Sequence, residues 1–445
     1  TTIRSCERKT MSDTSTSLPG LQHLSMRCRN MLAPPPVHVA VSMEVSQDLY
    51  HPQHNPEGYI VISVAENRAL FPTVLQPKLQ EYMEIPEESN FYGALHGIPY
   101  FRQALSSFLE RRVCHRPIPV DRMAIAAGCG SMLDTLFYSL MDQGDVVLVP
   151  APYYSGFDVD AGSRAKVELF PVPTSAENNF EVTVQDLQAA EEQLQRDGKS
   201  VSGLLMSNPT NPVGSIVSED SVRSLVEWTS TRGIAYISDE VYANTIFDRT
   251  AEPSFCSVAS LFSPEEMLEK QIYMVWGFSK DFGLSGERIG VLYTENVALL
   301  QTMGLLLYFS LVSASTQKML TNMLSDEEWT DSFLDQSEAN LRECYHMVKE
   351  ACEEAGIRVI PAHAGVFCFV GIPHLLPEPT KEAEFQFWKD VLVDQYKVVP
   401  TPGSAFHCPE PGWFRVCFGS TTKDTLKLAL DRLLAGVRTL QSSQM

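Results

Sequence analysis

The amino-acid sequence predicts an α/β protein with a large domain, in which helices cover a mostly parallel sheet, and a smaller α+β domain. Between about residues 100 and 330, amphipathic helical stretches alternate with short apolar runs that are typical of strands buried on both faces. Alternation of this kind favours a parallel sheet covered by helices. The final third opens with one long helical stretch and continues with mixed strands, which is typical of an α+β domain.

The individual elements follow from these patterns. Apolar residues at helical spacing predict helices over 101–113, 131–141 and 329–356. Continuous apolar runs predict strands at 146–150, 201–207, 234–238, 273–277, 289–294, 365–372 and 414–419. We expect four regions. Residues 1–45 form a flexible tail and arm, and residues 46–100 form the N-terminal part of the small domain and the entry segment. The large domain covers 101–329, and the C-terminal small domain covers 330–445.

Composition argues against several classes of function. The formal net charge of −21 over 445 residues disfavours nucleic acid and anionic membranes as partners. Ten cysteines without a CxxC pair indicate reduced thiols, and with them a cytoplasmic protein. No apolar run reaches the ~18 residues of a membrane-spanning helix, and the N-terminus lacks the hydrophobic stretch of a secretion signal. The histidines show no metal-binding spacing, so we expect no metal.

Polar clusters follow the predicted strands, at the ends where parallel sheets bind ligands. The side chains concerned are Tyr153 and Tyr154 after 146–150, Asn211 after 201–207, Asp239 and Tyr242 after 234–238, and Lys280 and Arg288 after 273–277. The small residues AAGCGS at 126–131 precede a predicted helix, whose free backbone N–H groups can hold a phosphate. Together these clusters predict one ligand site at one edge of the sheet.

Longer motifs carry a resemblance over roughly residues 58–435. The segments concerned are ISVAENRAL (62–70), HGIPYFRQAL (96–105), QGDVVLVPAPYYSGFD (143–158), ISDEVYANTIF (237–247), SKDFGLSGERIG (279–290) and EPGWFRVCF (410–418). With them the chain resembles the class I/II aminotransferase superfamily of pyridoxal 5'-phosphate (PLP) enzymes, fold type I. Within it the chain looks most like the 1-aminocyclopropane-1-carboxylate (ACC) synthase-like branch. The resemblance implies PLP as cofactor, an amino acid as substrate, and a homodimer with shared active sites.

By motif position, the resemblance implies a role for each residue around the cofactor ring. Lys280 would hold the cofactor covalently and, once displaced, act as the base for the substrate's Cα proton. Asp239 would keep the pyridine nitrogen protonated, which makes the ring an electron sink. Tyr242, also expected to be catalytic, and Asn211 would bond to the ring's 3-oxygen. Tyr154 would stack on the ring, with its neighbour Tyr153 as the alternative.

The phosphate and the substrate would be held by a second set of residues. The resemblance implies that Arg288, the backbone amides of Cys129 and Gly130, and the Ser131 side chain bind the phosphate, which Tyr92 would reach from a neighbouring subunit. On the substrate side, Arg415 would hold the carboxylate in a bidentate fork, which a lysine could not reproduce. Glu66 would lie at the edge of the site, and Asn211 would also contact the substrate.

Two positions depart from the pattern of the resembled families. Three residues before the lysine, where a phosphate-binding serine is usual, this chain has Gly277, and Ser279 could take over part of that role. Plant ACC synthases also carry a tyrosine directly before their His-Gly pair, whereas here Leu95 stands before His96.

The sequence leaves the reaction open. The ACC synthase-like branch favours carbon–sulfur lyase chemistry on a sulfonium or thioether amino acid, such as S-adenosylmethionine or a cysteine conjugate. An aminotransferase using an amino acid and a 2-oxo acid is the alternative. A catalytically silent binding relative would be expected to lose Lys280, Asp239 or Arg415, and all three are present.

Overall fold

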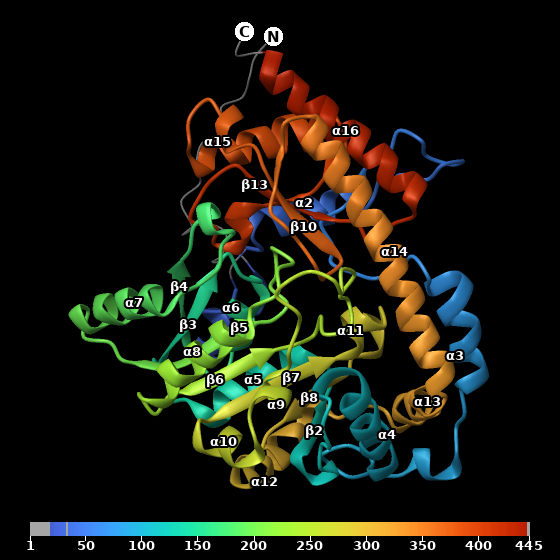
Figure 1. The fold of residues 1–445 in the computed structure, drawn as a ribbon, viewed down its shortest axis with the longest axis vertical. Helices are drawn as coiled ribbons and strands as arrows, with labels where there is room; N and C mark the ends of the chain where they lie inside the picture. The colour runs from blue at the N-terminus through green and yellow to red at the C-terminus, as the bar shows by residue number, and fades with distance from the viewer. Residues whose placement is uncertain (1–17, 33, 443–445) are drawn as a thin grey trace.

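A seven-stranded sheet forms the centre of the computed structural model, which describes residues 18–32 and 34–442. Its strand order is β2 (Met123–Ala126), β8 (Gly290–Tyr293), β7 (Ile272–Gly277), β6 (Ala235–Asp239), β5 (Val201–Ser207), β3 (Val146–Ala151) and β4 (Glu168–Pro173). Only β8 runs antiparallel to its neighbours in this sheet. The predicted mostly parallel sheet covered by helices is therefore confirmed (Figure 1).

Helices cover both faces of this sheet, because its strands are apolar on both sides. Ile237 and Val275 pack on one face, against α5 (Cys129–Leu140), α6 (Gly156–Gly162) and α12 (Val297–Leu306). Tyr236 and Trp276, one residue along each strand, pack on the other face. The helices there are α4 (Pro99–Leu109), α7 (Val184–Arg196), α8 (Glu219–Ser230), α9 (Val258–Leu261), α10 (Pro264–Glu269) and α13 (Ala314–Ser325).

A second, smaller core forms around a four-stranded antiparallel sheet. Its order is β12 (Thr401–Pro402), β13 (Trp413–Cys417), β10 (Phe367–Gly371) and β9 (Arg358–Val359). A parallel pair, β1 (Ile60–Val61) with β11 (Val398–Val399), shares this core with side chains of α2 (Val37–Val45), α15 (Lys381–Gln386) and α16 (Lys423–Ser442). Val41 and Val45 of α2 pack into this core.

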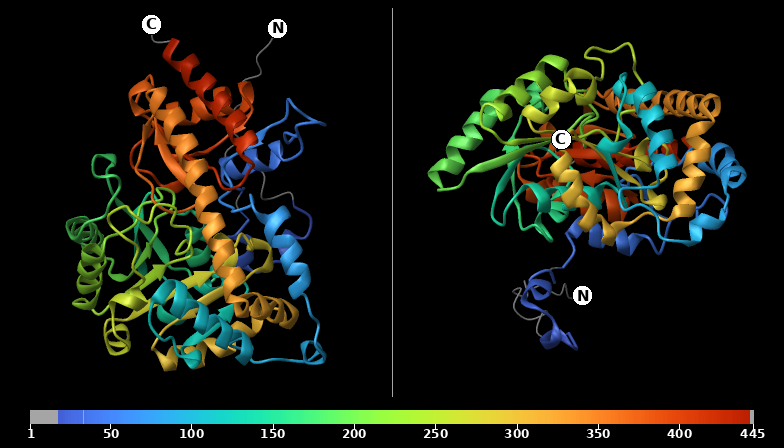
Figure 2. Two further views of the ribbon diagram at one scale, coloured as in Figure 1. Left: turned by 45° about the vertical axis from the view of Figure 1, so that its right-hand side comes forward. Right: turned by 90° about the horizontal axis from the view of Figure 1, so that it is seen from below.

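The long helix α14 (Glu327–Glu354) joins the two cores. Phe333 and Leu334 near its start belong to the core of the large sheet, whereas Leu341 and Val348 belong to the smaller core. Figures 1 and 2 show it running along one side of the molecule. The remaining α-helices are α1 (Met26–Arg29), α3 (Gln76–Tyr82) and α11 (Phe278–Asp281). Short 3-10 or π turns occupy Leu21–His23, Phe71–Leu75, Glu87–Asn90, Glu110–Cys114, Val120–Arg122, Ala176–Asn178, Ser285–Glu287, Leu307–Ser310, Pro373–Leu375, Phe387–Gln395 and Gly403–Phe406.

The predicted helices and strands are all present, with ends shifted by a few residues. The four-region division stays a prediction, and residues 1–17 of the predicted tail lie outside the described residues. Within the described ranges, the cysteines are free. No single helix there is long and apolar enough to cross a membrane, although Val297–Ser310 and Ala314–Ser325, bent by 113°, pass that test as a pair.

Candidate active site

Two of the predicted residues, Asp239 and Lys280, meet at the carboxyl edge of neighbouring strands. Asp239 is the last residue of β6 and pairs with Val275 of β7, and Lys280 follows β7 in α11. Asp239 is 6% exposed; its Oδ2 accepts a hydrogen bond from Ser207 Oγ (3.4 Å), and its Oδ1 has no hydrogen-bond partner among the described residues. Burial raises the pKa of Asp239 to about 7, against the opposing effect of the Lys280 charge.

Lys280 is held by the backbone of a distant loop. Its Nζ donates a hydrogen bond to the carbonyl oxygen of Ala65 (2.7 Å). Burial, and then the positive charge of Arg415, lowers the pKa of Lys280. A lysine with a lowered pKa is neutral more often at neutral pH, and its amine can then act as nucleophile or base.

A chain of hydrogen bonds connects Tyr242 to Arg415. Asn211 Nδ2 donates to Tyr242 Oη at 3.4 Å, and Arg415 Nη1 donates to Asn211 Oδ1 at 2.9 Å. Arg415 Nη2 donates to the carbonyl of Ser63 (2.6 Å). The guanidinium also lies over the rings of Phe367 and Phe406, with centroid distances of 5.1 and 4.6 Å. Tyr242, Asn211 and Arg415 are all buried, and burial raises the pKa of Tyr242.

The start of α5 and Arg288 bring backbone and guanidinium donors together. Gly128, at φ 92°, precedes the helix, and a Cβ there would overlap the Arg288 guanidinium. Arg288 Nη1 donates to the carbonyl of Ser285 (2.9 Å). The helix begins with Cys129 and Gly130, so their amides are among the first N–H groups, which lack a partner within the helix. The Ser131 hydroxyl donates to the carbonyl of Ala127 (3.1 Å).

The loop that holds Lys280 also carries Glu66. Its Oε1 accepts a hydrogen bond from Ser285 Oγ (2.9 Å), and its other oxygen pairs with Arg68. The negative charge of Glu66 acts on Lys280. The predicted position at the edge of the site is compatible with these contacts.

The two adjacent tyrosines differ in their surroundings. Tyr153 is buried, donates to Asp158 Oδ1 (2.8 Å) and stacks on His407 at 4.6 Å between ring centroids. Tyr154 is 44% exposed, and the charges of Arg415, Asp239 and Arg288 act on its hydroxyl. This difference favours Tyr154 as the residue that faces a ligand.

Tyr92 lies apart from the other predicted residues in the single chain. It is 97% exposed and lines a surface pocket together with Phe91, Leu95 and Leu311. Ser279 lies partly buried in α11, beside Lys280.

Sequence reasoning missed several groups around the site. The carbonyls of Ser63 and Ala65 are backbone atoms, which leave no signal in residue type. Asp160 faces Gly130, and burial raises its pKa to about 7. Asp281, directly after Lys280, is fully buried and accepts three hydrogen bonds, two from Asn244 and one from Trp276. The sequence feature that could have identified Asp281 is its position directly after Lys280 in the SKD motif.

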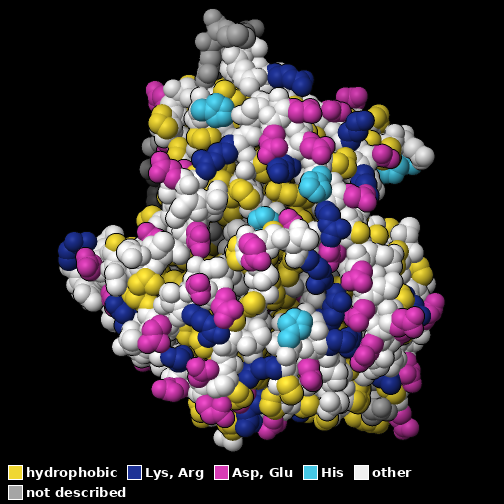
Figure 3. Space-filling view, viewed as in Figure 1, with side chains coloured by type: hydrophobic (Ala, Val, Ile, Leu, Met, Phe, Trp, Pro, Cys, Tyr) yellow, Lys and Arg dark blue, Asp and Glu magenta, His cyan; other side chains and the backbone are white. Residues whose placement is uncertain are grey.

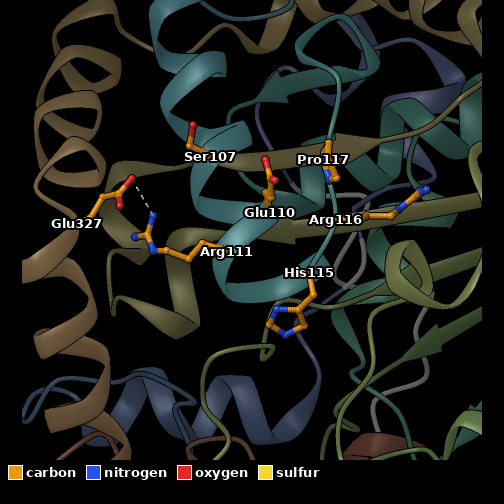
Figure 4. Close-up of a pocket in the computed structure, with 7 residues that line it drawn as sticks. All are labelled: Ser107, Glu110, Arg111, His115, Arg116, Pro117 and Glu327. Atoms are coloured by element: carbon orange, nitrogen blue, oxygen red, sulfur yellow. Dashed lines mark ion pairs between the residues drawn. The ribbon is translucent and has the colours of Figure 1, made fainter.

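A separate surface pocket is lined by none of the predicted residues (Figure 4). Its walls are Ser107, Glu110, Arg111, His115, Arg116, Pro117 and Glu327. Arg116 donates to Tyr293 Oη, and Tyr293 pairs with Met274 near the start of β7, away from Lys280. Charged side chains of both signs intermingle over the face in Figure 3.

The chain belongs to the aminotransferase class I and II family, whose pattern it matches over residues 59–433. Among curated relatives, it is 35% identical to 1-aminocyclopropane-1-carboxylate synthase-like protein 1 of Arabidopsis thaliana over 86% of this chain and 80% of that protein. It is 34% identical to 1-aminocyclopropane-1-carboxylate synthase 11 of the same plant, over 88% and 86%. The predicted family and branch are therefore confirmed.

Solved structures agree on the fold. A Thermus thermophilus aspartate aminotransferase double mutant superposes with a TM-score of 0.76 at 19% identity, covering 93% of this chain and 99% of that one. An aromatic aminotransferase from Pyrococcus horikoshii gives 0.74 at 19%, covering 91% and 99%. The chain is a PLP-dependent enzyme of fold type I, a lyase or an aminotransferase.

The residues present fit PLP chemically. The Oδ1 of Asp239, which has no hydrogen-bond partner in the described part of the chain, suits a protonated ring nitrogen. The start of α5 with Arg288 suits a phosphate dianion. The amine of Lys280, with its lowered pKa, suits an aldehyde.

Proposed function

We propose that this enzyme holds PLP through Lys280 and removes the Cα proton of an amino acid. When bound, PLP supplies an electron-accepting ring that stabilises negative charge at the substrate's Cα. Asp239 would hold the ring nitrogen in its protonated form, and Tyr242 with Asn211 would bond to the 3-oxygen. Arg288, the amides of residues 129 and 130, Ser131 and Ser279 would bind the phosphate, and Tyr154 would cover the ring.

The Lys280 amine would take the Cα proton. Its lowered pKa supports this role, because a base must be neutral before it can accept a proton. The hydrogen bond to the Ala65 carbonyl gives the freed amine a fixed resting position. We expect Lys280→Ala to lose the absorbance of the lysine-bound cofactor. Lys270→Ala, which removes a surface amine paired with Glu227 at 3.0 Å, should keep it.

Arg415 would orient the substrate by its carboxylate. A guanidinium has five N–H donors, and the bonds to Asn211 and Ser63 use two of them. The two bonds and the rings of Phe367 and Phe406 fix the plane of the group before substrate arrives. Such preorganisation reduces the free-energy cost of binding, and burial of the guanidinium limits competition from water. Glu66 would close the edge of the site.

For the reaction, we propose ACC synthase-like carbon–sulfur bond cleavage in a sulfonium or thioether amino acid. The observation that carries this proposal is the identity of 34–35% to ACC synthase and ACC synthase-like proteins over 86–88% of the chain. Cleavage would follow loss of the Cα proton, with the sulfur leaving as a thioether or thiol. Leu95, at the position of a tyrosine in plant ACC synthases, argues against ACC formation itself. Amino transfer is the second candidate, because the chain belongs to the aminotransferase class I and II family.

Two substrates and one spectrum separate these reactions. Incubation with S-adenosylmethionine should release methylthioadenosine and ACC if the enzyme is a synthase. Incubation with a cysteine conjugate should release a thiol, ammonia and a 2-oxo acid if it is a β-lyase. Accumulation of pyridoxamine phosphate with ordinary amino acids, and no sulfur product from either compound, would overturn the lyase proposal in favour of amino transfer.

We also propose a homodimer in which each subunit completes the other's site. The support is a set of exposed apolar side chains: Phe91 and Leu311, which line one pocket with Tyr92, and Leu305, Tyr308 and Phe309 in the segment just before Leu311. Tyr92 and Lys280 can be tested in one mixing experiment. Subunits carrying Tyr92→Ala and subunits carrying Lys280→Ala should regain activity when mixed, because each mixed dimer holds one intact site. No recovery in a verified mixed dimer would contradict shared sites.

The proposed location is the cytoplasm, where reducing conditions match the free cysteines. Fractionation of the source cells tests it, and recovery of the enzyme in an organelle or the medium would contradict it.

A further inference from the structure

The sulfur of Cys129 occupies the space above Gly277. Cys129 begins α5, and Gly277 ends β7, three residues before Lys280. A Cβ added to Gly277 would lie 2.6 Å from Cys129 Sγ and 2.7 Å from the carbonyl oxygen of Ile289. Real Cβ atoms do not approach so closely, so a side chain at 277 and the sulfur at 129 exclude each other.

The position of this sulfur is fixed from two directions. The thiol donates a hydrogen bond, at 3.3 Å, to the carbonyl oxygen of Trp276, which belongs to the strand that leads to Lys280. The backbone at the start of α5 lies against Gly290 of β8, where an added Cβ would overlap Gly128 and the nitrogen of Cys129. The start of α5 is therefore held against two neighbouring strands, by its backbone at Gly290 of β8 and by the sulfur at Gly277 of β7.

The thiol is electrically neutral where it lies. Burial and the Asp239 carboxylate raise the pKa of Cys129, although Lys280 and Arg288 act in the opposite direction. Those three charged groups are the ones proposed to hold the two ends of the cofactor. A neutral sulfur can fill space near these groups without adding charge at the phosphate end.

We propose that Cys129 is a positioning residue for the phosphate site: its sulfur, seated over Gly277, sets the spacing between the start of α5 and the strand that carries Lys280. The sulfur of residue 129 thus occupies part of the space that a side chain at 277 would need, and the Ile289 carbonyl closes the other part. This inference rests on the proposed role of α5 in holding the phosphate of PLP.

Four variants of the full chain test it: Gly277→Ser, Cys129→Ala, the double variant, and Gly162→Ser as a control in open space. The dissociation constants of PLP and of pyridoxal, which lacks the phosphate, are measured on purified enzyme stripped of cofactor. We expect Gly277→Ser to weaken PLP at least tenfold and pyridoxal less than threefold. Cys129→Ala should weaken PLP only a few fold. The double variant should bind PLP at least threefold more tightly than Gly277→Ser alone. It should not reach the wild type, because the Ile289 carbonyl still lies against the new Cβ. Gly162→Ser should not differ from the wild type.

Additive effects of the two substitutions, or equal losses for PLP and pyridoxal, would overturn the inference. Unimpaired PLP binding by Gly277→Ser would overturn it too. If Gly277→Ser fails to fold, Cys129→Ala alone decides: a larger loss of affinity for PLP than for pyridoxal supports the inference, and equal losses refute it. Failure of the proposed function would give a different result, because the wild type itself would then not bind PLP. The unfolding midpoints of the four variants would still show whether residues 129 and 277 are coupled.

Discussion

Replacing Asp239 by asparagine should stabilise the enzyme without cofactor at alkaline pH. Asp239 is 6% exposed, and its Oδ1 has no hydrogen-bond partner among the described residues. Three groups favour its ionised form and so oppose the rise in its pKa: the Val241 backbone N–H, the charge of Lys280 and the Ser207 hydroxyl. An amide has the same shape but no charge to bury, so the desolvation cost of the ionised carboxylate disappears.

The magnitude follows from the pKa. Burial raises the pKa of Asp239 from 3.8 to about 7, about three units, at 1.36 kcal/mol per unit. The folded state keeps its proton to higher pH than the unfolded chain, so stability from this residue falls as pH rises from about 4 to about 7. Above pH 7, the ionised carboxylate destabilises the folded protein by about 4 kcal/mol. The asparagine variant escapes this loss, and its advantage should vanish below pH 4.

Urea unfolding of both cofactor-free proteins between pH 4 and 8 measures the difference directly. Asp142→Asn, at an exposed site, controls for the loss of one charge. With PLP added, the order should reverse, since only the carboxylate can keep the ring nitrogen protonated. A constant difference across the pH range, or a wild type more stable than the variant at pH 8 without cofactor, would refute the reasoning.

Three further substitutions have outcomes fixed by local geometry. Arg415→Lys should raise KM at least tenfold with a smaller change in kcat, measured in steady-state kinetics, because an ammonium cannot form the planar fork. Asp281→Ala should lower the free energy of unfolding by about 3 kcal/mol in urea, because it leaves buried donors of Asn244 and Trp276 without an acceptor. Thr183→Ala should cost about 1 kcal/mol in the same assay and leave kinetics unchanged, because it removes the capping box of α7.

The central strands were predictable because each is a continuous apolar run. The two strands of the large sheet that the sequence did not reveal, β2 and β4, are the two edges of that sheet. Met123–Ala126 is only four residues long, and Glu168–Pro173 is largely half-buried and contains two prolines, which only an edge tolerates readily. The run at β2 is too short, and the run at β4 too interrupted, for periodicity alone to find them.

At the site, the predictable residues are side chains that follow a strand within a motif, such as Asp239 and Lys280. Contacts through the backbone were not predictable, since the Ala65 carbonyl that holds Lys280 carries no signal of residue type. Nor could the sequence reveal that Cys129 fills the space at Gly277, because 148 positions separate the two (277 − 129) and only the folded chain brings them together.

The two aspartates at this edge show why burial alone does not identify a functional carboxylate. Burial raises the pKa of both Asp239 and Asp281 to about 7. Asp281 accepts three hydrogen bonds from its surroundings, which tie the Lys280 helix to the loop after Tyr242, so removing it should destabilise the protein. Asp239 keeps one oxygen without a partner among residues 18–32 and 34–442, so neutralising it should stabilise the cofactor-free protein. A buried carboxylate that costs stability until something outside the chain bonds to it is the feature expected of a ligand contact.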